Sequence, residues 1–157
     1  MNGEYVVSIE TRLPRDFAAV RARLPLSEVP ARFRAYLDPV YAAARNGGPR
    51  LDGQNIFVYR DVPGSDRIAD VDFGVGLLAP FERIGDVHPA ALPAGEVATT
   101  THWGSYATLG NAHAAVMAWC REHGKALAGP RWEIYGHWDA DPRKCRTEVS
   151  YLVAEER

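Results

Sequence analysis

Two segments near the end of the chain combine acidic and aromatic side chains at strand-like spacing. In RWEIYGHW (131–138), Tyr135 lies two positions from both Glu133 and His137, and RTEVSYLV (146–153) contains Glu148. Because successive side chains of a strand point to opposite faces, an apolar core face is predicted for Val149, Tyr151 and Val153. A carboxylate beside aromatic rings in an apolar cleft suits a flat cation, and it also suits general acid or base chemistry.

Glu148 is the first candidate for such a site. If its strand pairs antiparallel with residues 132–137, Glu148 shares a face with Glu133, Tyr135 and His137. We therefore predict that Glu148 faces a pocket and that Tyr135 stacks on a ligand or donates a hydrogen bond to it. A solvated strand face for Glu148 and a half-buried core position for Tyr135 are the alternatives.

Further candidates are aromatic residues near the same segments and their counterparts earlier in the chain. Large aromatic side chains are costly to expose and form good pocket walls, although each also fits a core or cleft-rim position. The candidates are Trp103, Trp132, Trp138, Tyr59, Asp72 and Phe73.

Neither a metal nor a cofactor is predicted. The five histidines show no HExxH or other metal-binding spacing. Gly74-Val75-Gly76 resembles the start of a dinucleotide-binding loop, but no third glycine and no helix follow.

The segments that carry these residues recur in the same order in both halves of the chain. The pattern predicts strand, helix, strand, strand in each half. The helix of the first half begins at Ser27, a predicted N-cap, and contains Pro39. The predicted strands are 4–12, 17–24 (weaker), 55–60 and 68–79 in the first half, and 96–103, 132–137 and 146–153 around the helix 106–123 in the second.

Three residue pairs repeat at one spacing, since 124 − 48, 135 − 59 and 148 − 72 are all 76. They pair Gly124 with Gly48, Tyr135 with Tyr59 and Glu148 with Asp72. We therefore predict a single α+β domain built from a duplicated unit, with unit 1 at about 4–80 and unit 2 at about 92–154. Chance agreement of the three pairs is the alternative.

Composition excludes several classes of protein. The chain has 157 residues, 46% of them hydrophobic, enough to bury a core in one domain. A net charge of −2 gives no global field to attract nucleic acid or an anionic membrane. There is no apolar run of membrane-spanning length and no signal-peptide pattern. Cys120 and Cys145 are isolated, which predicts reduced thiols in the cytoplasm, with a single disulfide as the alternative.

The second half resembles the GyrI-like small-molecule-binding domain, which is also the effector-binding domain of many bacterial transcription regulators. Each motif is weak alone, and their order over about 60 residues makes the resemblance fairly specific. The first half agrees by element order more than by motif. The motifs are Leu92-Pro93-Ala94-Gly95, Gly104-Ser105-Tyr106, Gly129-Pro130, Ile134-Tyr135 and Thr147-Glu148.

The resemblance implies two strand-helix-strand-strand units related by a pseudo-twofold axis, with an antiparallel sheet, two main helices and a ligand cleft between the units. It implies binding of a small aromatic, sometimes cationic molecule for sensing or sequestration. Met1 lies only a few residues before the first strand, so we expect the free-standing form, without a DNA-binding segment.

Two other functions remain open. Some free-standing relatives are described as hydrolases that open strained cyclopropane rings, and in such an enzyme Glu148 and Tyr135 would be the catalytic residues. The third hypothesis is a protein-interaction module, for example for a DNA gyrase subunit. The sequence determines neither the ligand nor the oligomeric state.

Overall fold

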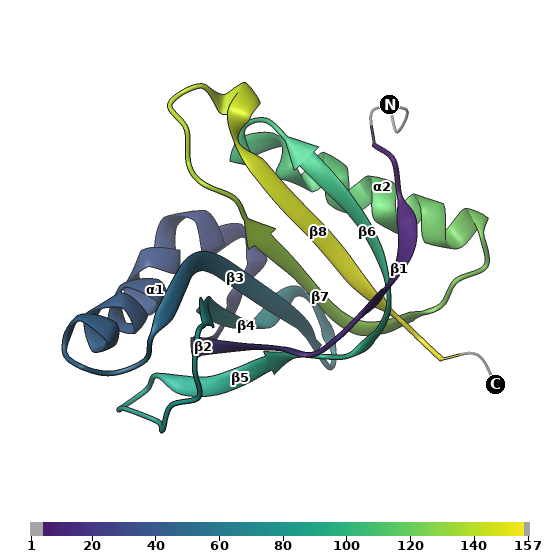
Figure 1. The fold of residues 1–157 in the computed structure, drawn as a ribbon. Helices are drawn as coiled ribbons and strands as arrows, with labels where there is room; N and C mark the ends of the chain where they lie inside the picture. Colours follow the sequence, from purple (N-terminus) through teal and green to yellow (C-terminus); the bar gives the residue numbers. More distant parts are fainter. Residues whose placement is uncertain (1–4, 156–157) are drawn as a thin grey trace. The chain divides into compact units, whose positions relative to one another are not determined.

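The computed structural model describes residues 5–155, which form eight strands, two α-helices and three short 3-10 helices (Figure 1). The contacts divide the chain into two units, each with four strands and one α-helix. The N-terminal unit is Pro14–Leu92, and the C-terminal unit combines Met1–Leu13 with Pro93–Arg157.

The N-terminal unit is an antiparallel sheet with strand order β5-β2-β4-β3 and one helix, α1. The helix packs against β2 and β4, where Leu37 and Val40 are buried and Tyr36 stacks on Phe73. The elements are β2 (Arg15–Pro25), the 3-10 helix η2 (Leu26–Glu28), α1 (Val29–Arg45), β3 (Leu51–Val62), β4 (Ser65–Leu77) and β5 (His88–Leu92).

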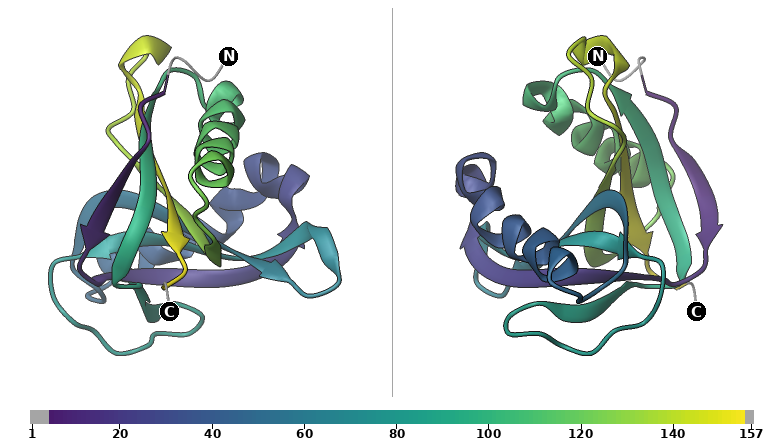
Figure 2. Two further views of the ribbon diagram at one scale, coloured as in Figure 1. Left: turned by 90° about the vertical axis from the view of Figure 1, so that its right-hand side faces the viewer. Right: turned by 60° about the vertical axis from the view of Figure 1, so that its left-hand side comes forward.

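The C-terminal unit repeats this arrangement with strand order β1-β6-β8-β7 and the helix α2 on one face (Figure 2). Ala112, Val116 and Cys120 of α2 pack against Val149 and Tyr151 of β8. The elements are β1 (Ser8–Arg12), β6 (Gly95–Trp103), η3 (Tyr106–Thr108), α2 (Leu109–Glu122), β7 (Leu127–Tyr135), η4 (Pro142–Lys144) and β8 (Arg146–Val153).

Strand register confirms the predicted duplication. Val58 lies opposite Asp72 in the N-terminal unit, and Ile134 lies opposite Glu148 in the C-terminal unit, both at the spacing of 76. The strand order is also the same in the two units. The predicted α+β class, with an antiparallel sheet and two main helices, is therefore confirmed.

Another pair at the same spacing lies in the bulges of β3 and β7. The register shifts between Leu51 and Asn55 and again between Leu127 and Arg131, and the bulges contain Gly53 (φ 83°) and Gly129 (φ 120°). Other residues rarely adopt such φ values, so glycine is needed at both places.

The glycine that ends each helix differs from the predicted pair. The glycines that follow the two helices with a positive φ are Gly47 (φ 84°) and Gly124 (φ 64°). Gly47, and not Gly48, is therefore the counterpart of Gly124. Gly48 is kept small by packing instead, because an added Cβ would lie 2.5 Å from the carbonyl oxygen of Ala43.

Three further details differ from the sequence-based expectations. β1 pairs with β6, so the contacts place the first strand with the C-terminal half, and the Phe17–Leu24 segment supplies the first strand of the N-terminal unit. The strand β5 was not expected; it pairs with β2 as β1 does with β6. Ser27 does not cap α1, because it lies within η2. Glu4, the start of the expected first strand, lies outside the described residues.

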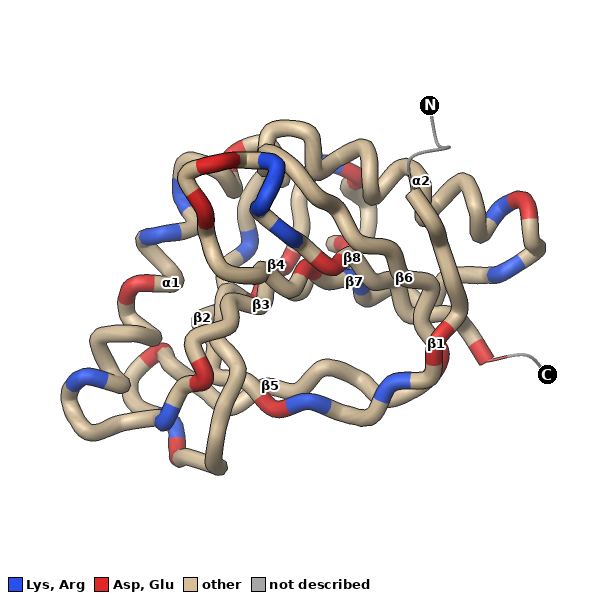
Figure 3. The backbone as a smooth tube through the Cα atoms, turned by 45° about the horizontal axis from the view of Figure 1, so that its top comes forward, with Lys and Arg blue, Asp and Glu red and all other residues tan. Residues whose placement is uncertain are grey.

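Acidic and basic residues are interspersed along the chain (Figure 3). Cys120 and Cys145 are both buried and unpaired with each other. No helix in residues 5–155 combines the length and the apolar character needed to cross a membrane.

Candidate functional site

The register between β7 and β8 decides which face each candidate occupies. Ile134 lies opposite Glu148, whereas Tyr135 lies opposite Thr147 and Glu133 lies opposite Val149. Directly opposed residues share a face, so Glu133 and Tyr135 lie on the α2 side. The predicted placement of Glu148 on one face with them is therefore wrong.

The α2 side of β7 and β8 contains a chain of four polar side chains. The Tyr135 hydroxyl donates to Glu133 Oε1 at 2.5 Å, and His113 Nε2 of α2 lies 2.7 Å from Glu133 Oε2. His113 Nδ1 lies 2.7 Å from the Tyr151 hydroxyl. Glu133 is only 5% exposed, and a carboxylate so buried needs these hydrogen bonds to offset its lost hydration.

Aromatic rings adjoin this cluster. Tyr106 of η3 meets Tyr135 edge-on, with ring centroids 5.6 Å apart and planes at 90°. Tyr106 is exposed and Tyr135 is half-buried. Partial desolvation of its hydroxyl and the neighbouring Cys145 raise the pKa of Tyr106, so this ring stays neutral at physiological pH. A carboxylate next to tyrosine rings can offer a bound cation both a negative charge and the face of an aromatic ring.

Glu148 lies on the sheet face away from α2 and is already paired. Arg12 Nη2 of β1 lies 2.5 Å from Glu148 Oε1, and the Thr99 hydroxyl is 3.5 Å from the same oxygen. The Glu148 side chain is 22% exposed, so it is partly shielded from bulk water. Its proposed contact with a ligand stays a prediction.

Asp72, the N-terminal counterpart of Glu148, is also paired with arginines. Its carboxylate accepts two hydrogen bonds from Arg21, at 2.8 and 3.1 Å, and one from Arg60 at 2.9 Å. Burial alone would raise the pKa of Asp72, but the hydrogen bonds and charges of Arg21 and Arg60 outweigh it and lower that pKa.

Tyr59 and Phe73 lie on the opposite face from Asp72, toward α1. Tyr59 lies opposite Val71, and Phe73 lies opposite Phe57. Phe73 is buried between Tyr36 and Phe57, with centroids at 5.2 and 4.9 Å. These contacts place Phe73 in the hydrophobic core, and its side chain lies on the opposite face of the sheet from that of Asp72.

The tryptophans occupy different environments. Trp132 is buried on the face of Glu148, opposite Ser150, whereas Trp103 and Trp138 are exposed. His137 follows β7 and is exposed. Of the predicted set, the structure thus places only Tyr135 at the Glu133 cluster.

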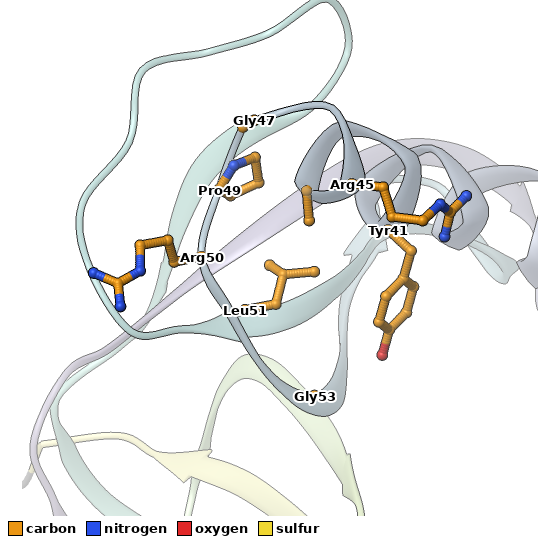
Figure 4. A pocket seen from close by; sticks show the side chains of 9 residues that line it. Tyr41, Arg45, Gly47, Pro49, Arg50, Leu51 and Gly53 are labelled. Atoms are coloured by element: carbon orange, nitrogen blue, oxygen red, sulfur yellow. The ribbon is translucent and has the colours of Figure 1, made fainter.

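A hollow of about 630 Å³ lies in the N-terminal unit, at the end of α1 (Figure 4). Tyr41 and Leu51 form part of its wall, with Arg45 and Arg50 at its edges. None of the predicted site residues lines it. Within residues 5–155, no group of three or more His, Cys, Asp or Glu side chains is placed to hold a metal ion.

The sequence contained a signal for two of the three cluster residues that were not predicted as site residues, His113 and Glu133. His113 is the fifth residue of α2, as Phe33 is of α1, and Glu133 is the register counterpart of Phe57. Aligning the helices from their first residues and the strands by register places this polar pair where the other unit has two phenylalanines. The helix residues are 80 positions apart and the strand residues 76, so the single spacing of 76 does not find both.

Comparisons with solved structures agree with this fold. The C-terminal domain of EcmrR aligns with a TM-score of 0.80 at 19% identity, covering 97% of this chain and 99% of that one. SAV2435 bound to tetraphenylphosphonium gives 0.67 at 12% identity, covering 95% and 94%. A hydrolase from Listeria innocua gives 0.56 at 14%, covering 94% and 91%. At these identities the likeness shows the fold alone.

Comparison with curated proteins found no match. The sequence matches the family described as GyrI-like small molecule binding domain over residues 5–152. Because that match spans nearly the whole chain, this protein belongs to the GyrI-like small molecule binding domain family.

Proposed function

We propose that the protein binds a small aromatic cation on the α2 side of β7 and β8, with Glu133 supplying the negative charge and Tyr135 a ring face. The observation that carries this proposal is the buried carboxylate of Glu133, hydrogen-bonded by a tyrosine and a histidine. Burying a carboxylate in a sheet–helix interface is costly, and the other unit has Phe57 there instead. A role in ligand binding explains the burial of this carboxylate better than a role in folding does.

Two further findings support a cationic aromatic ligand. The family is one of small-molecule-binding domains, and a structural neighbour is bound to tetraphenylphosphonium. Tyrosine faces attract cations, by about 0.5–1 kcal/mol where exposed and by about 2 where desolvated. With one charge and stacked rings, we expect micromolar affinity, roughly −8 kcal/mol at 1 μM.

Titration calorimetry with tetraphenylphosphonium tests the proposal. Glu133→Gln keeps the shape and removes the charge, so affinity should fall about 10- to 100-fold, the equivalent of a charge-assisted contact of about 1.5–3 kcal/mol. Tyr135→Phe removes the hydroxyl and keeps the ring, so a smaller loss is expected.

Glu148→Gln is the matched comparison, because Glu148 lies on the same sheet but on the other face. If the ligand binds at Glu133, and not at the site predicted from the sequence, Glu148→Gln should leave affinity unchanged. Near-ultraviolet circular dichroism should show all three variants folded. If Glu148→Gln weakened binding and Glu133→Gln did not, the ligand would lie on the opposite face and the proposal would be wrong.

Hydrolysis of an electrophilic compound is the second candidate. It is favoured by the contact of Glu133 with two proton-carrying groups, the Tyr135 hydroxyl and the His113 imidazole, since such groups perform acid–base chemistry. Incubation with a cyclopropane-bearing alkylator, followed by mass spectrometry, tests it. A ring-opened product carrying one added water, lost in Glu133→Gln, would establish an enzyme.

A further inference from the structure

The duplication supplies an internal reference for the side chains between helix and sheet. In the N-terminal unit Phe33 and Phe57 meet with ring centroids 5.8 Å apart, where the C-terminal unit has His113 and Glu133. The neighbouring set of opposed residues on the same sheet face contains a second such difference, at Thr147. Where one unit has an apolar side chain, the fold does not require a polar one in the other unit.

The counterpart of Thr147 in the N-terminal unit is Val71. Thr147 lies opposite Tyr135 and Val71 lies opposite Tyr59, and each residue is 76 positions from its counterpart. Thr147 and Val71 are both 0% exposed. Because threonine and valine have nearly the same shape, the two side chains at this buried place differ in effect by one hydroxyl group.

The hydroxyl of Thr147 has no hydrogen-bond partner within residues 5–155. Its neighbour across the strands is His102 of β6, and both ring nitrogens of His102 have partners already, the Tyr5 hydroxyl at 2.8 Å and the Ser105 carbonyl at 2.9 Å. A buried hydroxyl without a partner costs stability, and such groups are rare in folded proteins. The hydroxyl therefore needs a reason other than folding.

Thr147 lies beside the aromatic rings of the proposed site. Tyr135 is directly opposite it on β7, an arrangement that places Cβ atoms about 4.5–5.5 Å apart. The ring of Tyr106 meets that of Tyr135, and the Tyr106 hydroxyl interacts with Cys145, two residues before Thr147. Tyr106 thus contacts residues on two sides of Thr147, and at 42% exposure its ring is the part of this group that a ligand meets first.

We propose that the Thr147 hydroxyl is a hydrogen-bonding subsite of the ligand site. The ligand is then an aromatic molecule that carries a hydroxyl, carbonyl or amide group, and this group pairs with Thr147 Oγ1 when the Tyr106 ring moves aside. A threonine hydroxyl both donates and accepts, so each of these groups fits. This inference rests on the proposed function, because it takes Tyr135 as a wall of the ligand site.

The test compares two aromatic cations that differ by one hydroxyl group. The first is (4-hydroxymethylphenyl)triphenylphosphonium, whose alcohol does not titrate, and the second is (4-ethylphenyl)triphenylphosphonium, which has a methyl group in place of that hydroxyl. The corresponding meta-substituted pair is measured as well, because the subsite has a fixed position. Calorimetry on the wild-type protein should show about five- to tenfold higher affinity for the alcohol in at least one pair, the equivalent of one net hydrogen bond.

Thr147→Val is the decisive variant, because it copies the side chain that the N-terminal unit has at this place. It should bind the alcohol and the ethyl probe alike. Its urea unfolding midpoint should equal or exceed that of the wild type, because the variant lacks the unpaired hydroxyl. Thr147→Ser keeps the hydroxyl and should retain the preference for the alcohol.

Thr100→Val is the matched control on the same sheet face. Thr100 is also buried and also has a valine as its counterpart, Val20, since Thr100 lies opposite Val149 and Val20 lies opposite Phe73. Its hydroxyl, however, donates to the carbonyl of Val6 at 2.8 Å. Thr100→Val should therefore lower the urea midpoint and keep the wild-type preference for the alcohol.

Two binding results would overturn the inference and leave the proposed function standing. One is equal affinity of the wild type for the alcohol and the ethyl probe in both pairs, and the other is a preference for the alcohol that persists in Thr147→Val. A marked fall in the urea midpoint of Thr147→Val would also overturn it, because the hydroxyl would then have a structural partner such as an ordered water. Failure of the wild type to bind any of the phosphonium probes would overturn both this inference and the proposed function.

Discussion

The buried carboxylate of Asp72 allows a quantitative prediction with a control built into the same pair of strands. Asp72 and Asp70 of β4 each accept a two-pronged hydrogen bond from an arginine of β2, at 2.8 and 3.1 Å from Arg21 and at 2.8 and 3.0 Å from Arg23. The geometry is nearly the same in both pairs. Burial differs, because the side chain of Asp72 is 1% exposed and that of Asp70 is 27% exposed.

Asp72→Asn keeps the shape and removes the charge. Truncating one partner of a fully buried ion pair costs about 3–5 kcal/mol. Here Arg21 and Arg60 are 53% and 34% exposed, so water rehydrates them in the variant, and asparagine keeps one acceptor oxygen. We therefore expect a smaller loss of about 2–3 kcal/mol in the free energy of unfolding, from three weakened charge-assisted bonds.

Urea unfolding at neutral pH measures this loss, with Asp70→Asn as the control. Arg23 is largely exposed, and surface ion pairs contribute little, so Asp70→Asn should leave the unfolding midpoint nearly unchanged. Equal effects of the two substitutions would show that burial does not set the strength of these pairs, and the reasoning would be refuted.

The same pair predicts a dependence on pH. The pKa of Asp72 is lowered in the folded protein, so its stabilisation is fully present above the ordinary pKa of an aspartate. That stabilisation is lost as the pH falls through the lowered folded-state value. The difference in unfolding free energy between wild type and Asp72→Asn should accordingly shrink in acid.

Two further substitutions probe the packing of each unit. The double variant His113→Phe with Glu133→Phe copies the aromatic contact of the N-terminal unit, so urea unfolding should show equal or greater stability while calorimetry shows loss of cation binding. Gly74→Ala should destabilise strongly, because a Cβ there would lie 2.4 Å from a backbone oxygen and 2.5 Å from Phe17. Gly110→Ala, in open space on α2, should instead stabilise by about 0.5–1 kcal/mol in the same assay.

Strands and helices were predictable where one face is apolar. The strand 146–153 was predicted with the bounds that β8 has, because Val149, Tyr151 and Val153 alternate without interruption. The short strand β5 (HPAAL) was missed because it has little alternation and contains a proline; its pairing with β2 defines it. Ser27 was mistaken for a helix cap because a 3-10 turn precedes α1, and a 3-10 turn has nearly the same apolar pattern as the helix that follows.

The relative phase of two strands could not be predicted from the sequence. Alternation within β7 correctly grouped Glu133 with Tyr135, and alternation within β8 correctly separated Glu148 from Val149. The error was the pairing between the strands, because a shift of one residue moves every side chain to the other face. The connection from Gly136 to Cys145 sets that phase, and it contains η4 and an irregular loop whose geometry has no simple sequence signal.

Comparison of the two units distinguishes residues with a structural role from residues that a ligand site would need. An acid stands at the position of Asp72 and Glu148 in both units, and both acids bind an arginine, Arg21 from β2 in one unit and Arg12 from β1 in the other. An acid that recurs in both units, but pairs with arginines from non-equivalent strands, is typical of an ion pair that stabilises each unit. The polar pair His113–Glu133 has no such recurrence, since phenylalanines take its place in the N-terminal unit. The recurrence of an acid at the position of Glu148 thus favours a structural role for that residue. The lack of an acid equivalent to Glu133 in the other unit supports the proposed role of Glu133 in binding a ligand.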